Sequence, residues 1–189
     1  MARKSIEQLR DIGKKISELG FVIGEGGNIS VREKNLIFIK RKGASMEEAA
    51  TTDYIPVSFK TGRPLRKGDE PSTEIYMHLA CYRARDDINA VIHTHPIFAT
   101  ALGMVKRKPA VFTYEAAVNI RSSVAYIGYL RPGTSRLGQA VGRAARKHNA
   151  LLLKNHGLVT VGRNVREAYL RTLAVERAAI VYLVQRLLQ

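Results

Sequence analysis

The chain has 189 residues, 46% of them hydrophobic, which is enough apolar material to bury the core of one domain. Its 31 lysines and arginines outnumber its 16 aspartates and glutamates, giving a net charge of +15 that favours polyanions or phosphorylated metabolites as ligands. The cations are scattered in short groups without tryptophan or a nucleic-acid motif, which argues against a nucleic-acid binder. We therefore expect one domain, residues 1–189, that binds no nucleic acid.

The single cysteine, Cys81, lies within an apolar helical pattern and has no second cysteine to pair with. This excludes an intrachain disulfide framework and a cysteine metal cluster, and it favours a reducing compartment. No apolar run approaches the ~20 residues of a membrane span, and the first residues lead directly into an amphipathic pattern. We therefore expect a cytoplasmic protein with no membrane segment.

In chain order, the first expected element is an amphipathic helix. Apolar residues recur at helical spacing over 6–19, the segment 5–8 matches a capping box, and Gly20 would end the helix. Two alternating runs, 28–32 and 36–40, then predict a hairpin with a tight turn. The later elements are a strand at 55–59, a turn at 60–63, a helix at 72–85, a strand at 90–95, a short helix after Pro96, a strand at 110–114, a helix at 135–148, a strand pair around 156–157 and a long helix after a capping box at 164–167. The order of strands and helices predicts an α/β fold.

Three histidines follow apolar runs that are expected to be strands. His93 and His95 follow residues 90–92, and His156 follows residues 151–153. Residues i and i+2 of a strand share one face about 6.6 Å apart, so two imidazoles can reach one ion at about 2.0–2.1 Å while a third comes from elsewhere. Three protein ligands with an open fourth position are typical of catalytic zinc. The alternative is that these are ordinary histidines at strand ends.

Two segments have the composition of anion-binding sites. Residues 24–28 contain three glycines, which allow close backbone approach, and Asn28 can donate from its side chain, although a plain tight connection has the same composition. Ser72 and Thr73 add two hydroxyls to the N-terminus of an expected helix, where free N–H groups and the helix dipole attract anions. Ser72 is equally suited to capping that helix, and the two roles are compatible.

Glu74 is expected in the first turn of the same helix. A carboxylate there stabilises the helix dipole. Beside an anion pocket and a Lewis-acidic ion, it could also take a proton from a carbon next to a carbonyl. His78 lies one turn further on the same face, where it is either a fourth metal ligand or a support for the helix.

Four motifs occur in the order and spacing of the class II aldolase/adducin family, and the sequence resembles that family over roughly residues 5–185. They are Gly27-Asn28-Ile29-Ser30, Pro71-Ser72-Thr73-Glu74, His93-Thr94-His95-Pro96 and Asn155-His156-Gly157-Leu158. The resemblance implies a three-layer α/β/α sandwich around a mainly antiparallel or mixed sheet. It also implies a homotetramer whose active sites lie between subunits.

The resemblance further implies one Zn²⁺ per subunit, bound by His93, His95 and His156. Glu74 would be the catalytic base and would complete the resting metal shell. A tyrosine that acts as an acid from the neighbouring subunit maps onto Tyr114. The phosphate pocket of the family maps onto Gly27, Asn28, Gly43, Ser72 and Thr73.

One position departs from the family pattern. Many relatives have a Thr-Gly pair where this chain has Lys42-Gly43, so a cation replaces a hydroxyl. Lys42 could strengthen phosphate binding or hold a different anionic group. The alternative is a solvent-facing lysine in a basic hairpin.

The activity that the resemblance implies is cleavage of a ketose 1-phosphate to dihydroxyacetone phosphate and a small aldehyde by a zinc-dependent aldolase. Pentulose-phosphate 4-epimerases and methylthioribulose-phosphate dehydratases of the same family are the alternative enzymes. A non-catalytic binding module similar to the adducin head is the alternative from another class. The presence of Glu74 and all three histidines argues against such a module, because a scaffold needs no open metal site.

Overall fold

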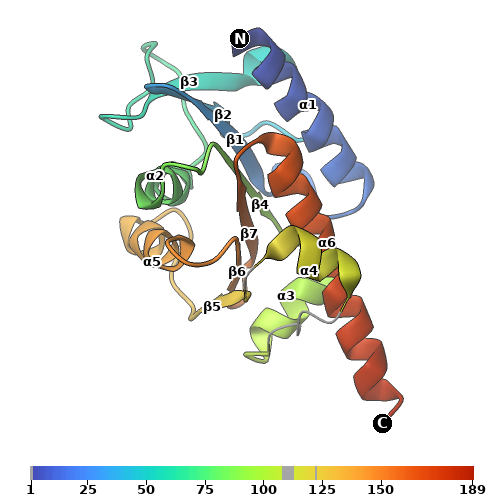
Figure 1. Ribbon diagram of the computed structural model, residues 1–189. Helices are drawn as coiled ribbons and strands as arrows, with labels where there is room; N and C mark the ends of the chain where they lie inside the picture. The colour runs from blue at the N-terminus through green and yellow to red at the C-terminus, as the bar shows by residue number, and fades with distance from the viewer. Residues whose placement is uncertain (1, 108–112, 122) are drawn as a thin grey trace.

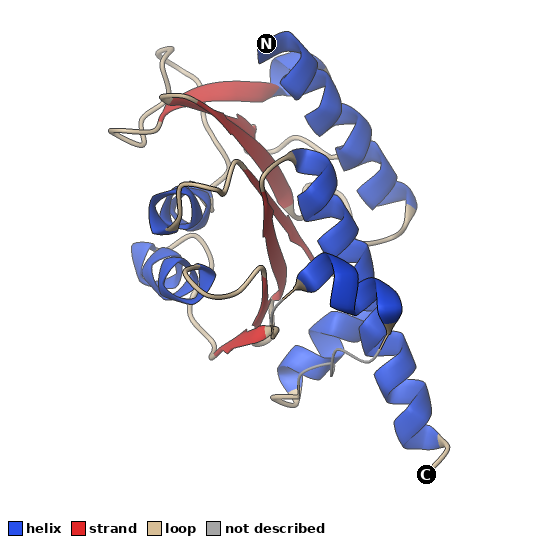
Figure 2. Cartoon of the chain, viewed as in Figure 1, coloured by secondary structure: helices blue, strands red, loops and turns tan. Residues whose placement is uncertain are grey.

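The computed structural model describes residues 2–107, 113–121 and 123–189. These residues contain one seven-stranded sheet with helices on both of its faces (Figures 1 and 2). The strands are β1 (Asn28–Glu33), β2 (Leu36–Lys40), β3 (Tyr54–Ser58), β4 (Ala90–Thr94), β5 (Ala125–Ile127), β6 (Ala150–Leu153) and β7 (Gly157–Gly162). The helices are α1 (Ala2–Glu18), the 3-10 turn η1 (Thr51–Asp53), α2 (Ile75–Ala84), α3 (Ile97–Met104), α4 (Tyr114–Ile120), α5 (Ser135–Ala145) and α6 (Val165–Leu187).

The strand order is β3-β2-β1-β4-β7-β6-β5. All neighbouring strands pair antiparallel except β5 and β6, which pair parallel. Central strand β4 pairs on one side with β1, where His93 is opposite Asn28, and on the other with β7, where His93 is opposite Val159. The mixed sheet and the α/β class confirm the predicted fold.

The two helical layers cover opposite faces of the sheet, as Figure 2 shows edge-on. Helices α2 and α5 cover one face, and α1, α3, α4 and α6 cover the other. Alternation along β4 follows this division, because Val91 packs with the α2 and α5 side chains whereas Ala90 and Ile92 pack with those of α1 and α6. Since His93 shares the face of Val91, its imidazole is directed to the α2 side of the sheet.

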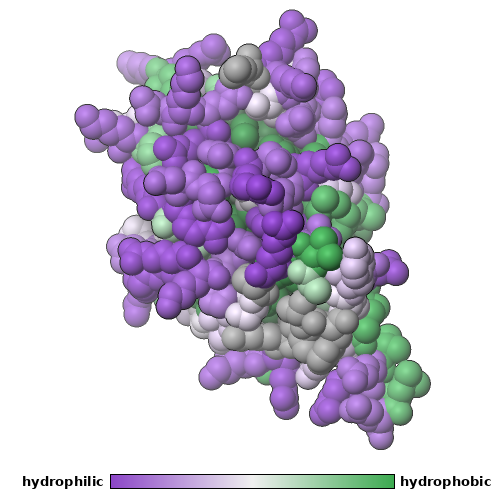
Figure 3. Space-filling view, in the orientation of Figure 1, coloured by the Kyte–Doolittle hydropathy of each residue, from purple (hydrophilic) through white to green (hydrophobic). Residues whose placement is uncertain are grey.

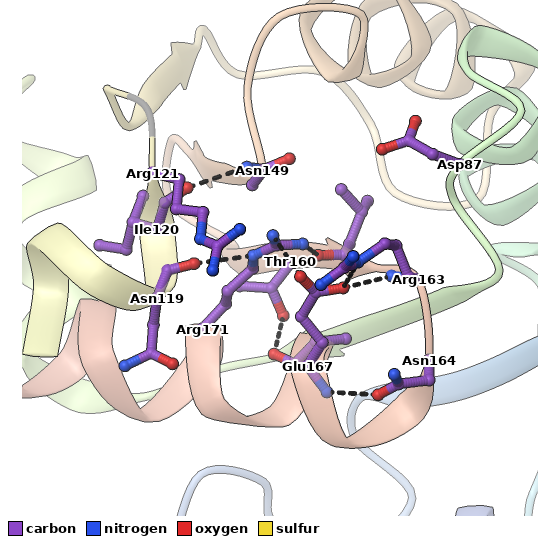
Figure 4. Close-up of polar contacts among 12 residues, drawn as sticks. Asp87, Asn119, Ile120, Arg121, Asn149, Thr160, Arg163, Asn164, Glu167 and Arg171 are labelled. Carbon is purple, nitrogen blue, oxygen red and sulfur yellow. Dashed lines mark hydrogen bonds and ion pairs between the residues drawn. The ribbon is translucent and has the colours of Figure 1, made fainter.

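A buried arginine joins two helices of the other layer to the sheet. Arg171 of α6 is 4% exposed, and it donates to the carbonyl oxygens of Asn119 at 2.9 Å and Val161 at 2.6 Å. It also pairs with Glu167 Oε1 at 2.9 Å (Figure 4). The guanidinium therefore fastens α6 to strand β7 and to the last turn of α4, the helix that begins with Tyr114.

Several boundaries differ from the prediction. Helix α1 already includes Ala2, so Ser5 lies inside it and bonds the Glu33 carboxylate, and the predicted capping box is wrong. Helix α2 begins at Ile75 because the Ser72 N–H is bonded to the Lys40 carbonyl at 3.0 Å, which holds that residue against β2.

The later boundaries include one confirmed cap. Helix α5 ends at Ala145 rather than 148. Asn164 caps α6 as predicted, since its Oδ1 accepts the Glu167 N–H at 2.8 Å. In the segment expected as a strand at 110–114, residues 110–112 lie outside the described residues and Tyr114 begins α4.

The surface combines a largely hydrophilic face with an apolar end. Figure 3 shows hydrophilic residues over most of this view and apolar surface at the lower right, toward the end of α6. The exposed apolar side chains of that helix end are Val181, Val184, Leu187 and Leu188. Among the described helices, none combines the length and the hydropathy that crossing a membrane requires.

Candidate active site

The three predicted histidines come together at one end of the central strands. His93 Nε2 lies 3.1 Å from His95 Nε2 and 3.1 Å from His156 Nε2. His93 ends β4, His95 follows it, and His156 lies in the turn between β6 and β7. The prediction that two histidines two residues apart would meet a third from elsewhere in the fold is confirmed.

The protonation of these rings suits a cation. His93 Nδ1 lies 3.0 Å from the Leu158 carbonyl oxygen, which can only accept, so that nitrogen carries a proton and Nε2 is the atom that faces the other two rings. Burial, with the neighbouring His93, lowers the pKa of His95 and of His156 to about 4. Both imidazoles are therefore neutral at pH 7, the form that binds a metal ion.

Glu74 completes the cluster from the N-terminus of α2. Its Oε2 lies 3.1 Å from His93 Nε2, and its Oε1 lies 3.4 Å from His156 Nε2. Burial raises the pKa of Glu74, but the adjacent His93 ring and a hydrogen bond from Asn28 outweigh burial and hold that pKa well below its usual range. The carboxylate is therefore ionised at neutral pH, although it is buried.

Three imidazole nitrogens and one carboxylate are ligands that suit a divalent ion such as zinc. Their ring nitrogens lie within 4.8 Å of one another, and Glu74 Oε1 accepts no hydrogen bond from the described residues. An unsatisfied buried carboxylate oxygen beside two neutral imidazoles and a third ring is costly without a cation. The donor set thus fits the ion that the sequence predicts.

Two glycines allow the chain segments to approach closely enough to form the site. Gly27 has φ = +64°, and a Cβ there would lie 2.7 Å from the His93 carbonyl oxygen. A Cβ on Gly157 would overlap the Thr94 carbonyl oxygen and lie 2.7 Å from His95 Cδ2. Both glycines therefore hold the turns beside the end of β4, where the histidines meet.

A cavity of about 240 Å³ opens beside the histidines. Its walls contain all six residues predicted to bind phosphate together with Glu74, His95 and His156; the six are Gly27, Asn28, Lys42, Gly43, Ser72 and Thr73. Ser72 Oγ accepts the Glu74 N–H at 3.4 Å, which leaves its own hydroxyl proton free to donate. The structure therefore brings the predicted anion pocket and the predicted metal ligands together, whereas a phosphate contact stays a prediction.

Two of the predicted site residues are exposed and less closely associated with the cavity. Lys42 lines the cavity, but its ammonium pairs with Glu70 at 3.1 Å and its side chain is 57% exposed. Tyr114 is 80% exposed and is not among the described residues that line the cavity.

Lys40 is a cavity residue that the sequence analysis missed. It is 2% exposed, and its ammonium donates to the Glu25 carbonyl oxygen at 3.0 Å and contacts the Ala44 carbonyl oxygen. Burial lowers its pKa. The sequence offers one signal for this residue, because a cation ends the apolar run 36–39. Lys40 joins the glycine loop to the loop after β2.

The remaining histidine near the site is not a metal ligand. His78 is fully buried, with Nε2 bonded to Asn28 Oδ1 and Nδ1 lying 2.6 Å from Ser30 Oγ. Both ring nitrogens are therefore engaged. Of the two interpretations from the sequence, structural support is the correct one.

Comparison with known proteins agrees with this arrangement. Residues 7–183 match the family model of the Class II Aldolase and Adducin N-terminal domain. An L-fuculose phosphate aldolase of Methanococcus maripaludis is 35% identical over 159 residues, covering 84% of this chain and 85% of its own. A 5-deoxy-D-ribulose 1-phosphate aldolase of Bacillus thuringiensis is 31% identical over 187 residues, covering 96% and 85%. A solved structure of an L-fuculose 1-phosphate aldolase superimposes with a TM-score of 0.88 at 31% identity, covering 98% of this chain and 87% of that one.

Proposed function

The chain belongs to the class II aldolase and adducin family, and from this premise we propose that it cleaves a ketose 1-phosphate similar to L-fuculose 1-phosphate into dihydroxyacetone phosphate and a small aldehyde. One observation carries the proposal. Glu74, His95 and His156 line the cavity that contains the predicted phosphate residues, and His93 Nε2 lies 3.1 Å from the Nε2 atoms of both histidines. A base, a metal site and an anion pocket in contact are the parts that aldol chemistry on a sugar phosphate needs.

The metal site would be held by His93, His95 and His156, with Glu74 as a further ligand in the resting state. We propose one Zn²⁺ per subunit, which would supply Lewis-acid polarisation of the substrate carbonyl. His93 Nδ1 donates to the Leu158 carbonyl oxygen, which would leave Nε2 as the atom that holds the ion.

Glu74 is the proposed base. In the condensing direction it takes a proton from the carbon next to the carbonyl of dihydroxyacetone phosphate. Its Oε2 is occupied by the Asn28 N–H at 3.0 Å, whereas Oε1 accepts no hydrogen bond from the described residues. Oε1 is therefore the oxygen that receives the proton.

The anion pocket would hold the phosphate through backbone N–H groups of Gly27 and Gly43 and the side chains of Asn28, Ser72 and Thr73. Lys42 would add a cation, in competition with its partner Glu70. Binding the phosphate at a distance from the reacting carbon orients the substrate against Glu74.

The acid is proposed to come from a second copy of the chain. Tyr114 of a neighbouring subunit would protonate the aldehyde oxygen as the new bond forms. The 80% exposure of this tyrosine and the apolar end of α6 support a homotetramer with active sites at subunit interfaces. We also propose that residues 1–189 act as one domain in the cytoplasm, which the lone buried Cys81 supports.

A second substrate is favoured by one observation, since the relative named a 5-deoxy-D-ribulose 1-phosphate aldolase covers 96% of this chain. The same residues would then cleave a shorter ketose phosphate. The family's 4-epimerase and dehydratase reactions, and a non-catalytic module, are the competing outcomes of the test below.

The test is to incubate the zinc-loaded protein with L-fuculose 1-phosphate, 5-deoxy-D-ribulose 1-phosphate, methylthioribulose 1-phosphate and a pentulose 5-phosphate, and to identify the products by NMR. We expect dihydroxyacetone phosphate from one of the first two. Epimerised, dehydrated or unchanged substrate would overturn the aldolase proposal.

A matched variant tests the base. Glu74→Gln should keep the affinity for dihydroxyacetone phosphate but stop exchange of its carbon-bound proton in deuterated water, because an amide is no base at neutral pH. Undiminished exchange would assign the base to another residue.

A further inference from the structure

A line of buried polar groups runs from Glu74 away from the cavity into the layer between α2 and the sheet. Asn28 Nδ2 donates to Glu74 Oε2 at 3.0 Å, and Asn28 Oδ1 contacts His78 Nε2. His78 Nδ1 lies 2.6 Å from Ser30 Oγ, which lies 2.6 Å from the Tyr82 hydroxyl. Each of the five side chains is at most 8% exposed.

The two elements that supply these groups explain why they meet. Asn28 and Ser30 are two residues apart on β1 and share a face, whereas His78 and Tyr82 are four residues apart on α2 and share a side of that helix. Strand and helix thus contribute alternate members of the line. None of the three groups beyond Asn28 lines the cavity among the described residues.

The direction of the hydrogen bonds follows from the Asn28 amide, which lies between Glu74 and His78. Asn28 presents its NH₂ to Glu74 and its carbonyl oxygen, which can only accept, to His78. His78 Nε2 must then donate. Burial lowers the pKa of His78 to about 3, so the ring is neutral with one proton, and Nδ1 accepts from Ser30.

The hydroxyl groups of Tyr82 and Ser30 donate in the same direction. Burial raises the pKa of Tyr82, so its hydroxyl keeps its proton, which it donates to Ser30. Every bond in the line therefore donates toward Glu74. Reversing the line would turn the Asn28 oxygen against the carboxylate, placing two buried acceptors together.

We propose that His78 is a positioning residue that fixes the orientation of the Asn28 amide, so that one N–H holds Glu74 Oε2 and the other faces the anion in the cavity. The proposal rests on the proposed function for the identity of the base and the anion. Through the Asn28 amide, the buried His78 imidazole would determine both the placement of the Glu74 carboxylate and one contact to the substrate phosphate. Without the His78 donor, the amide can rotate and lose both.

The first measurement concerns the ring itself and needs no activity. In ¹⁵N-labelled wild-type protein, the imidazole ¹⁵N shifts of His78 should report the Nε2–H tautomer at pH 7. An Nδ1–H or doubly protonated ring would overturn the proposal, whatever reaction the protein catalyses.

The second measurement compares two variants. His78→Leu keeps the approximate volume but cannot donate to Asn28, whereas His78→Gln keeps an N–H for Asn28 and an oxygen that accepts from Ser30. With His78→Leu, we expect inorganic phosphate to bind roughly 10–100-fold more weakly and proton exchange of dihydroxyacetone phosphate to slow by a similar factor, because the Asn28 amide loses a buried hydrogen bond. His78→Gln should restore both to within roughly threefold of wild type.

Thr172→Val is the control, because Thr172 is a fully buried hydroxyl of α6 bonded to Thr160 and remote from this line. It should leave phosphate affinity and exchange unchanged, and zinc content should stay at the wild-type level in all three variants. Unchanged phosphate affinity in His78→Leu, or His78→Gln as impaired as His78→Leu, would overturn the proposal. If His78→Leu does not fold, the wild-type tautomer and His78→Gln measured against wild type still decide, because His78→Gln more than roughly tenfold weaker in phosphate binding would overturn the proposal. A wild-type protein that binds phosphate but catalyses no exchange would reject the proposed function alone.

Discussion

Replacing Arg171 with Ala tests whether the buried guanidinium holds α6 and α4 in place. The change removes hydrogen bonds to two carbonyl oxygens and an ion pair with Glu167, all at 2.6–2.9 Å (Figure 4). It leaves the carbonyl oxygens of Asn119 and Val161 without that donor. Hydrogen bonds to a charged group are worth roughly 1.5–3 kcal/mol each, and breaking one side of a buried ion pair costs about 3–5 kcal/mol.

The expected loss of unfolding free energy for Arg171→Ala is therefore about 3–5 kcal/mol rather than the sum of the bonds. Glu167 moderates the loss because it keeps the Arg163 backbone N–H at 2.6 Å and the Arg163 side chain at 3.2 Å. Arg163 supplies the control, since it pairs with the same carboxylate but its side chain is 64% exposed. Arg163→Ala should cost only about 0–1 kcal/mol.

The assay is urea denaturation followed by far-UV circular dichroism, at one fixed protein concentration because assembly would add to the apparent stability. A gap of about 3 kcal/mol between the two variants corresponds to more than a hundredfold in the unfolding equilibrium. Equal losses, or a loss below about 1 kcal/mol for Arg171→Ala, would refute the view that burial of the guanidinium makes it a structural anchor.

Three further predictions concern the site. Purified protein should carry about one divalent ion per chain, and replacing any of the three clustered histidines with Ala should remove it; elemental analysis showing a full complement in one variant would exclude that histidine as an essential ligand. Lys42→Thr should raise KM more than it lowers kcat if the ammonium leaves Glu70 for the substrate phosphate, whereas an unchanged KM would favour a surface ion pair. Glu74→Gln and Tyr114→Phe proteins should each be nearly inactive. Tetramers randomly mixed from equal amounts of the two should regain activity at about a quarter of their sites. No recovery after confirmed subunit mixing would place both residues in one chain's site or remove Tyr114 from the chemistry.

Much of the central sheet could be predicted because its periodic patterns are strong. The β1–β2 hairpin, strand β4 and the β6–β7 pair all occur within one or two residues of the predicted positions. Strand β5 has three residues and α4 has seven, too few for a periodic signal, so both were missed.

The site could be predicted only in part, for a physical reason. Strand alternation was enough to place His93 and His95 together, but the meeting with His156 depends on the pairing of β4 with β7, which no local pattern specifies. Similarly, the burial of Lys40 depends on carbonyl groups of two loops. The line behind Glu74 joins a strand and a helix more than 40 residues apart in sequence, and its hydrogen bonds arise only in the folded chain.

The pairing of Asn28 with His93 across β1 and β4 has a consequence for how this chain tolerates insertions. A single extra residue inside β1 would turn either Asn28 or Val31 to the opposite face of the sheet. In the first case Glu74 would lose its hydrogen-bond donor, and in the second an apolar side chain would leave the core. The turn at Lys34-Asn35 lies at the other end of the same hairpin, beyond the Glu33–Leu36 pair. Added residues there would project from the sheet without changing the alignment at His93. That turn is consequently a position where a peptide tag or an engineered loop can be introduced with little effect on the metal and phosphate residues.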